Sequence, residues 1–345
     1  MPSPRLEVAL QNAWLHRGPW AVALWPLSQV FRAVVVLRKA LYGLGLREPT
    51  ALPVPVIVVG NLIAGGAGKT PTVMAVVRAL QSAGWSPGVI SRGYGRATEA
   101  PQVFEVRSDS PAGQAGDEPL LLRLRLNVPV FVGADRVAVA QALLAEHPKV
   151  DVLVSDDGLQ HLRLPRAAQV IVFDERGAGN RWMLPSGPLR EPLTRVPPPH
   201  TVVLYNAPHA STEWPGHLAT RRLAGVVDLA GWWAGQPATL AGLTALAAER
   251  EPVTAAAGLS QPERFFSMLR GAGLTIAPLP LPDHHAFTAL PWPADTAHVV
   301  VTEKDAVKLR PERFAAGASH TRLWVAPLDF SADAGFDTAL TSLLN

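Results

Sequence analysis

The sequence predicts an α/β fold: a doubly wound, mostly parallel sheet of the P-loop NTPase type, with a second, smaller α/β lobe and an N-terminal amphipathic helix. Short apolar runs alternate with segments of helical periodicity, which is typical of parallel sheets whose strands are joined by helices. One apolar run, 54–60, leads into a glycine-rich turn that ends in Lys-Thr and is followed by a helical segment. The length of 345 residues exceeds one usual hydrophobic core and favours two lobes.

Composition narrows the classes of function. Of the residues, 48% are hydrophobic and only 17% charged, and the formal net charge is +3. A mild positive excess suits phosphates or an anionic membrane surface. No basic run with interleaved aromatic residues and no helix-turn-helix or zinc-finger spacing is present, so nucleic acid is not an expected partner. Disulfides, thiolate metal sites and cysteine catalysis are excluded because the chain has no cysteine, and no obligate protein partner is evident from the sequence.

The N-terminal segment 19–31 is apolar and aromatic, and cations punctuate it and its continuation to residue 39. Its uncharged stretches are shorter than the ~20 residues of a membrane-spanning helix. No small-residue cleavage site follows a short apolar core, as a secretory signal would require. Trp and Leu beside Arg and Lys are typical of a helix lying in the membrane interface. A helix packed on the protein's own core is the alternative.

The remaining elements are expected in alternating order. Strands are predicted at 54–60, 87–91, 128–132, 150–154, 170–173, 201–205, 253–257, 298–301 and 323–326, and helices at 71–83, 135–146, 262–270 and 336–344. Asp135 is expected to cap its helix. Segment 207–236 is expected to be irregular. The predicted domains are an interfacial membrane-helix region at 1–48, a P-loop domain at 49–206, a linker or ribbon at 207–250, and a C-terminal α/β lobe at 251–345.

The loop after the first strand is suited to the phosphates of a nucleoside triphosphate. It comprises Ile63, Ala64, Gly65, Gly66, Ala67, Gly68, Lys69 and Thr70. Glycines let backbone N–H groups converge on phosphate oxygens, and the helix N-terminus adds its dipole. We expect Lys69 to reach the phosphates and the Thr70 hydroxyl to bind Mg²⁺. Ile63 stands where the usual pattern has its first glycine, so the start of the loop is not standard, and a plain glycine-rich turn is the alternative.

Two adjacent acids, Asp156 and Asp157, follow the apolar strand at 150–154. P-loop enzymes hold Mg²⁺ or its water shell with an acid at such a strand end. Neighbouring carboxylates repel each other unless a cation neutralises them. Asp-Asp-Gly is also favourable turn chemistry, but next to a phosphate loop the pair predicts a metal site.

Four further segments are open to two interpretations each. Asp117 precedes an apolar helix and could be a catalytic acid or a helix cap, and its spacing alone favours the cap. Arg190 could bind phosphate and Glu191 could assist a metal, or the two could form a surface salt pair. His284, next to an aspartate, could support an acid or bind phosphate, or it could lie in a solvated loop. Segment 302–305 has the wrong spacing for a guanine-binding motif and is interpreted as structural or close to the nucleotide.

Seven segments together resemble the tetraacyldisaccharide 4′-kinases, the lipid A 4′-kinases. They lie, in that family's order, at 60–71, 91–95, 116–119, 156–161, 184–191, 283–284 and 302–305. The residue Ile63 belongs to the family's pattern, whereas 257–262 matches it more loosely. The resemblance covers roughly residues 10–310 and is specific because the segments occur in order.

The resemblance implies a reaction and a location. The γ-phosphate of ATP would move to the 4′-hydroxyl of a tetraacylated glucosamine disaccharide 1-phosphate, in lipid A biosynthesis. The protein would be peripheral, on the cytoplasmic face of the bacterial inner membrane, and would contact an anionic membrane surface. Two other hypotheses stay open. One is a P-loop NTPase acting as a regulatory or metal-delivery switch at the membrane, and the other is a nucleotide-binding membrane scaffold without catalysis.

The resemblance also implies roles for single residues. Asp117 would be the catalytic base, supported by His284, which reverses the preference for a helix cap. Catalysis would also use Lys69 and Arg190. Mg²⁺ would be held by Thr70, Asp156, Asp157 and Glu191.

Overall fold

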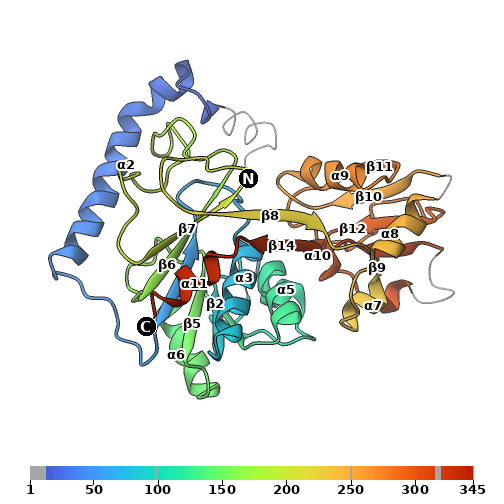
Figure 1. Ribbon diagram of the computed structural model, residues 1–345, viewed down its shortest axis with the longest axis horizontal. Coiled ribbons are helices and arrows are strands. Elements are labelled where there is room, and N and C mark those ends of the chain that lie inside the picture. The colour runs from blue at the N-terminus through green and yellow to red at the C-terminus, as the bar shows by residue number, and fades with distance from the viewer. Residues whose placement is uncertain (1–12, 98, 249–250, 315–319, 345) are drawn as a thin grey trace. The chain divides into compact units, whose positions relative to one another are not determined.

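The computed structural model describes residues 13–97, 99–248, 251–314 and 320–344, which divide between two compact units (Figure 1). Unit 1 comprises Met1–Arg92, Asp135–Thr220 and Ser331–Asn345, and unit 2 comprises Gly93–Ala134 and Arg221–Phe330. Each unit is thus assembled from segments that are distant in the sequence. The domain boundaries expected from the sequence remain a prediction.

Unit 1 is built on parallel strands in the order β8-β7-β6-β1-β5-β2. Their bounds are β1 Val56–Gly60, β2 Pro87–Ser91, β5 Val152–Asp156, β6 Ala168–Asp174, β7 Thr201–Asn206 and β8 His217–Leu223, and the helices are α2 Pro19–Gly43, α3 Lys69–Ser82, α6 Arg136–Glu146 and α11 Phe336–Thr341. Strands β1, β2, β5 and β6 are buried throughout, as expected where helices cover both faces of a parallel sheet. The doubly wound, mostly parallel sheet is confirmed.

The central strand β1 sets the position of the phosphate loop. Ile57 lies beside Val154 of β5 on one side and Ala168 of β6 on the other. The last residue, Gly60, must lack a side chain because a Cβ would lie 2.7 Å from Cγ of Leu159. The loop therefore begins at the carboxyl end of the most central strand, where ligands of open α/β sheets bind.

Unit 2 is a smaller α/β unit. Its sheet has the order β11-β10-β12-β13-β9, parallel except for β9. The elements are β3 Val103–Glu105, α4 Ala112–Ala115, α5 Asp117–Leu126, β4 Val130–Gly133, β9 Val227–Asp228, α7 Leu229–Trp233, α8 Leu240–Ala247, β10 Val253–Ala257, α9 Pro262–Gly271, β11 Ile276–Pro280, β12 His298–Val301, α10 Glu303–Ala306, the 3₁₀ turn Pro311–Phe314 and β13 Arg322–Val325. Its core joins Phe265, Phe266 and Leu269 of α9 to Val300 of β12. Strand β14, Leu328–Ala332, contains the point where the chain passes from unit 2 to unit 1.

Segment 207–236 is more regular than its sequence indicates. It contains β8, β9 and α7, and α8 follows. Strand β8 was missed because its sequence, His-Leu-Ala-Thr-Arg-Arg-Leu, has no continuous apolar run and most of its residues stay partly or fully exposed. The expectation of irregular structure was wrong here. The C-terminal helix α11 also ends at Thr341 rather than at 344.

Helix α2 is one continuous helix of 25 residues, although Pro26 lies inside it. It is longer than the uncharged stretches of the sequence suggested. By length and composition it could cross a membrane, with a mean hydropathy of 1.6 and only 11% of that window buried. Those two properties do not separate a spanning helix from a signal sequence, but the exposure shows that α2 is not a core helix. Its outward side chains include Trp20, 77% exposed, and Leu37, 63% exposed.

Candidate active site

The glycine-rich loop of unit 1 is fixed from inside by Asn61. This side chain is buried, and its amide donates to the carbonyl oxygens of Ile63, at 2.8 Å, and Gly65, at 3.0 Å. Its own oxygen accepts from Nζ of Lys69 at 3.1 Å. Asn61 thus sets both the loop and the direction of the lysine. The sequence analysis gave Asn61 no role, although it lies within the first segment of the family resemblance.

Two side chains behind the loop bind its carbonyl oxygens. The Arg176 guanidinium donates to Ala64 at 3.3 Å and to Gly66 at 3.0 Å. The Asn206 amide donates to Ala67 at 3.0 Å. Phosphate oxygens need N–H donors rather than carbonyls. Holding three carbonyl oxygens on these side chains therefore favours a loop conformation suited to an anion.

The unusual Ile63 has a packing role. It is fully buried and forms an isolated antiparallel bridge with Leu189. The next residue, Ala64, donates its N–H to the Pro188 carbonyl at 2.8 Å. A glycine at position 63 would leave this part of the core unfilled. The start of the loop is therefore fastened to the segment that carries Arg190.

The acid pair ends strand β5, and its two carboxylates have different partners. Asp156 is 4% exposed and accepts from the Ser91 hydroxyl at 3.0 Å. Asp157 has a left-handed backbone, with φ of 50°. Its Oδ1 lies 3.5 Å from Nζ of Lys69 and 3.3 Å from Nη1 of Arg190. The structure thus brings the predicted lysine, arginine and acid pair together in unit 1.

Glu191 faces α2. Its carboxylate pairs with Lys39 of α2 through Oε2 and accepts from Gln160 through Oε1 at 3.0 Å. Gln160 in turn lies 3.5 Å from Nη1 of Arg190. Polar contacts therefore lead from α2 to the arginine that pairs with Asp157. The role of Glu191 as a metal ligand remains a prediction, and a metal there would have to replace one of these contacts.

Basic groups lie behind the acid pair. Arg136 is 2% exposed, and burial lowers its pKa to about 10 against the opposing effect of Asp156 and Asp157. Burial, together with the charges of Arg136 and Arg92, lowers the pKa of His161 to about 4. His161 is therefore neutral at physiological pH. The sequence analysis assigned neither residue, although Arg136 directly follows the cap residue Asp135, which accepts from two backbone N–H groups of α6 as expected.

In unit 2, Asp117 pairs with His284. Asp117 is the first residue of α5, and its Oδ2 lies 3.0 Å from Nδ1 of His284. The N-cap is Gly116, whose position has no side-chain cap bond, so the interpretation of Asp117 as a cap is wrong. Gly116 has φ of 88°, and a Cβ there would lie 3.2 Å from Cα of Gly93. Only glycine lets the chain pass this closely before the acid.

The surroundings of Asp117 keep its carboxylate ionised. Burial alone would raise its pKa, but the hydrogen bond from His284 and the charges of Lys308 and Lys304 hold that pKa below its ordinary value. The His284 ring, at a left-handed backbone position, lies 5.2 Å from the ring of Tyr94. An ionised carboxylate with a fixed imidazole beside it can accept a proton from a hydroxyl group.

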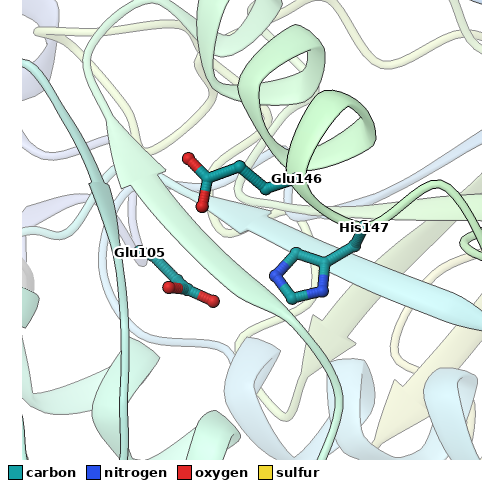
Figure 2. Close-up of side chains that lie close together, drawn as sticks. All are labelled: Glu105, Glu146 and His147. Carbon is teal, nitrogen blue, oxygen red and sulfur yellow. The ribbon is translucent and has the colours of Figure 1, made fainter.

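Three other ionisable side chains contact neither the Lys69–Asp157–Arg190 group of unit 1 nor the Asp117–His284 pair of unit 2 in the interactions described above. Glu146 is the last residue of α6 and His147 follows it, whereas Glu105 belongs to β3 (Figure 2). Glu105 pairs with Arg107 at 3.0 Å. Because Glu105 belongs to unit 2 and the other two to unit 1, they do not form a metal site within either unit.

Comparison with known proteins identifies the family. The family model described as tetraacyldisaccharide-1-P 4′-kinase, LpxK, matches residues 20–345. The chain belongs to this family. A tetraacyldisaccharide 4′-kinase of Leptothrix cholodnii is 54% identical over 99% of this chain and 97% of its own length. That of Methylibium petroleiphilum is 53% identical over 98% and 94%.

A solved LpxK structure shares the fold. The crystal structure of an "apo" form of LpxK from Aquifex aeolicus, in complex with ATP, aligns with a TM-score of 0.75 at 24% identity. The alignment covers 94% of this chain and 99% of that one. The predicted family, kinase class and fold are confirmed by these findings. The roles of the single residues remain predictions.

Proposed function

We propose that this LpxK-family protein transfers the γ-phosphate of ATP to the 4′-hydroxyl of a tetraacylated glucosamine disaccharide 1-phosphate, a step of lipid A biosynthesis. The family match over residues 20–345 carries the proposal. One group of residues in each unit supports it, because the P-loop lysine with its arginine and acid pair in unit 1, and the partly buried Asp–His pair in unit 2, suit phosphoryl transfer to a hydroxyl.

The phosphate loop would hold ATP, as the crystallised Aquifex relative does. Lys69 lies 15% exposed beside Asp157, a contact that a phosphate can replace. Lys69 and Arg190 would neutralise negative charge on the phosphates as it redistributes during transfer. The oxygen donors of Thr70, Asp156 and Asp157 fit the preference of Mg²⁺ for hard oxygen ligands. When bound, Mg²⁺ supplies further charge neutralisation at the phosphates.

Asp117 would accept the proton of the 4′-hydroxyl. The O–H bond of the acceptor breaks, its oxygen forms a bond to the γ-phosphorus, and the bond from that phosphorus to ADP breaks. His284 orients the carboxylate through the contact of 3.0 Å. Because the pKa of Asp117 is lowered, the group is ready as a base at neutral pH.

Helix α2 would place the protein at the cytoplasmic face of the bacterial inner membrane, as a peripheral protein. Its exposed Trp20, Trp25 and Leu37 suit the acyl boundary, and the exposed Arg32 and Arg38 suit anionic head groups. The lipid acceptor resides in the same membrane. We propose that α2 lies along the membrane surface and does not cross it, because Arg32, Arg38 and Lys39 interrupt its apolar sequence.

Transfer of label tests the function directly. The full chain is incubated with γ-labelled ATP, Mg²⁺ and the tetraacyl disaccharide 1-phosphate in detergent micelles. We expect lipid-bound phosphate at the 4′ position, and Lys69→Met should slow its formation about 10²-fold while Lys149→Met, at an exposed lysine, should not. Label released only as inorganic phosphate would instead favour an NTPase switch, an alternative that the kinase-named relatives do not support.

A further inference from the structure

The segment that follows β12 surrounds the Asp117–His284 pair with charged side chains. It carries Lys304 and Lys308, four residues apart, with Asp305 between them. Side chains at this spacing share a face of a helical turn. The sequence analysis left segment 302–305 as structural or close to the nucleotide. Its contacts within unit 2 show a more specific arrangement.

Lys308 lies between two carboxylates. Its side chain is 5% exposed, and Nζ is 3.3 Å from Oδ2 of Asp117 and 3.1 Å from Oδ1 of Asp305. The ring of Phe287 lies 5.2 Å from the same nitrogen. A buried ammonium is stable only with such partners. Lys308 is therefore placed to form ion pairs with Asp117 and Asp305 at once.

Asp305 anchors this lysine. It is fully buried, and its Oδ2 accepts from the backbone N–H of Gly258 at 3.0 Å and from the Thr302 hydroxyl at 2.8 Å. The remaining oxygen, Oδ1, meets Lys308. Because Asp305 is held by three donors, it fixes the position of the ammonium relative to the backbone of unit 2.

Lys304 sets the proton of His284. Its Nζ lies 3.4 Å from Nε2 of His284, 3.0 Å from Asp283 and 3.3 Å from Glu118. Although burial lowers the pKa of Lys304, Glu118 and Asp283 raise it further than burial lowers it. An ammonium group has only donors, so Nε2 must accept, and an ionised Asp117 only accepts, so Nδ1 must donate. The two contacts are satisfied together when the ring proton lies on Nδ1 and Nε2 accepts from Lys304.

We propose that Lys308 and Lys304 are positioning residues of the transfer reaction. Lys308 holds Asp117 as an oriented carboxylate, and Lys304 holds the proton of His284 on the nitrogen that faces Asp117. The inference rests on the proposed function for the task of Asp117. Beyond that function, the inference names the two lysines as the groups that keep the Asp117 carboxylate ionised and oriented. Among the described residues of unit 2, the two lysines also pair with Glu118, Asp283 and Asp305.

The pH profile of the kinase separates this role from simple structural support. Lys308→Met keeps the length of the side chain and removes its charge, so Asp117 should bind protons more readily. We expect the acid limb of kcat/KM to move to higher pH and kcat to fall about 10²-fold through loss of orientation. Lys149→Met is the matched control and should leave the profile unchanged. An acid limb at the wild-type position in Lys308→Met would overturn the proposal.

Carboxyl titration gives a readout that needs no kinase activity. The Asp117 carboxyl is followed by ¹³C NMR in the full chain and assigned with Asp117→Asn. The titration midpoint of Asp117 should rise in Lys308→Met whether or not the wild type phosphorylates the lipid. A risen midpoint without lipid phosphorylation by the wild type would refute the proposed function alone. Normal lipid phosphorylation by the wild type, with an unmoved midpoint in Lys308→Met, would refute the inference alone.

A second variant, Lys304→Met, tests the proposal if Lys308→Met does not fold. Lys304→Met removes the ammonium group that faces Nε2 of His284 and leaves Lys308 and Asp305 in place. We expect the ¹⁵N signals of the His284 ring to lose the pattern of a single Nδ1–H form, which the wild type should show. Identical ring signals in both proteins would contradict the assignment of Lys304.

Discussion

The two clusters use lysine in opposite ways. In unit 1, Lys69 is 15% exposed, and its acidic partner Asp157 is 35% exposed at 3.5 Å. In unit 2, Lys308 is 5% exposed, and its partners Asp117 and Asp305 are 10% and 0% exposed at 3.3 and 3.1 Å. One ammonium is open to exchange its partner for a ligand, whereas the other is enclosed by the protein.

The difference in burial separates a lysine that can bind a ligand from a lysine that holds neighbouring side chains in position. Solvent partly screens the Lys69–Asp157 ion pair, whose side chains are 15% and 35% exposed, so a phosphate can displace Asp157 at a small cost in free energy. A buried pair cannot lose one member without leaving an uncompensated charge. Unit 1 thus presents a charge to an incoming ligand, and unit 2 uses charges to fix its own side chains. The predictions below test this contrast.

The largest expected effect separates the two clusters by kinetics. Asp117→Asn keeps shape and removes the proton acceptor, so kcat should fall about 10³-fold while KM for ATP stays close to that of the wild type. Lys69→Met should instead lower kcat/KM for ATP about 10²-fold, because it removes charge from the phosphate loop. Steady-state kinetics with ATP and lipid varied in turn measures both. Wild-type turnover by Asp117→Asn would remove this residue from the mechanism.

The next effect concerns the free energy of unfolding when the acidic partner of each lysine is replaced, Asp305 for Lys308 and Asp157 for Lys69. Asp305→Asn leaves Lys308 with one carboxylate and weakens two hydrogen bonds, so unfolding should become easier by about 3 kcal/mol. Asp157→Asn, at the more exposed of the two ion pairs, should change the free energy of unfolding by less than about 1 kcal/mol. Urea denaturation of both variants compares them directly. Equal losses would show that the two lysines do not differ in the way proposed.

Helix α2 extends the contrast, since it leaves large apolar side chains such as Trp20 and Trp25 exposed. Replacing Trp20 and Trp25 by Ser should weaken partition into anionic vesicles about tenfold or more, because large aromatic surface no longer enters the interface. Leu240→Ser, at a leucine of unit 2 that is 64% exposed, is the control. Vesicle sedimentation measures the partition. Unchanged partition would refute the membrane role of α2, and retention after alkaline carbonate treatment would favour a spanning helix over a peripheral one.

The sequence predicted unit 1 better than unit 2 for a physical reason. The phosphate loop and the acid pair are continuous stretches at the ends of apolar strands, so strand, loop and chemistry can be read from one segment. The pairing of Lys69 with Asp157 follows from the parallel neighbours β1 and β5. Asn61 was missed because its role is internal to the loop and depends on burial.

Unit 2 depends on contacts between distant residues. Asp117, His284 and Lys308 are far apart in the chain, and the sequence alone favoured a helix cap for Asp117. The family resemblance supplied the link between the acid and the histidine. Lys308 carried no signal, because a lone lysine after an acidic segment is ordinarily a solvated side chain. Its burial between two carboxylates is a property of the folded unit.

The smallest expected effect concerns His161 of unit 1, a partly buried imidazole. Its folded pKa is lowered to about 4, whereas the unfolded chain protonates near 6.5, so the unfolded state binds more protons between these values. Stability should therefore be full above about pH 6.5 and decline as the pH falls toward 4. Because the ring is only partly buried, screening limits this contribution to about 1 kcal/mol. In His161→Gln, urea midpoints should vary less with pH over this range than in the exposed control His209→Gln. Equal slopes would show that burial and the charges of Arg136 and Arg92 do not lower the pKa of His161 in the folded protein.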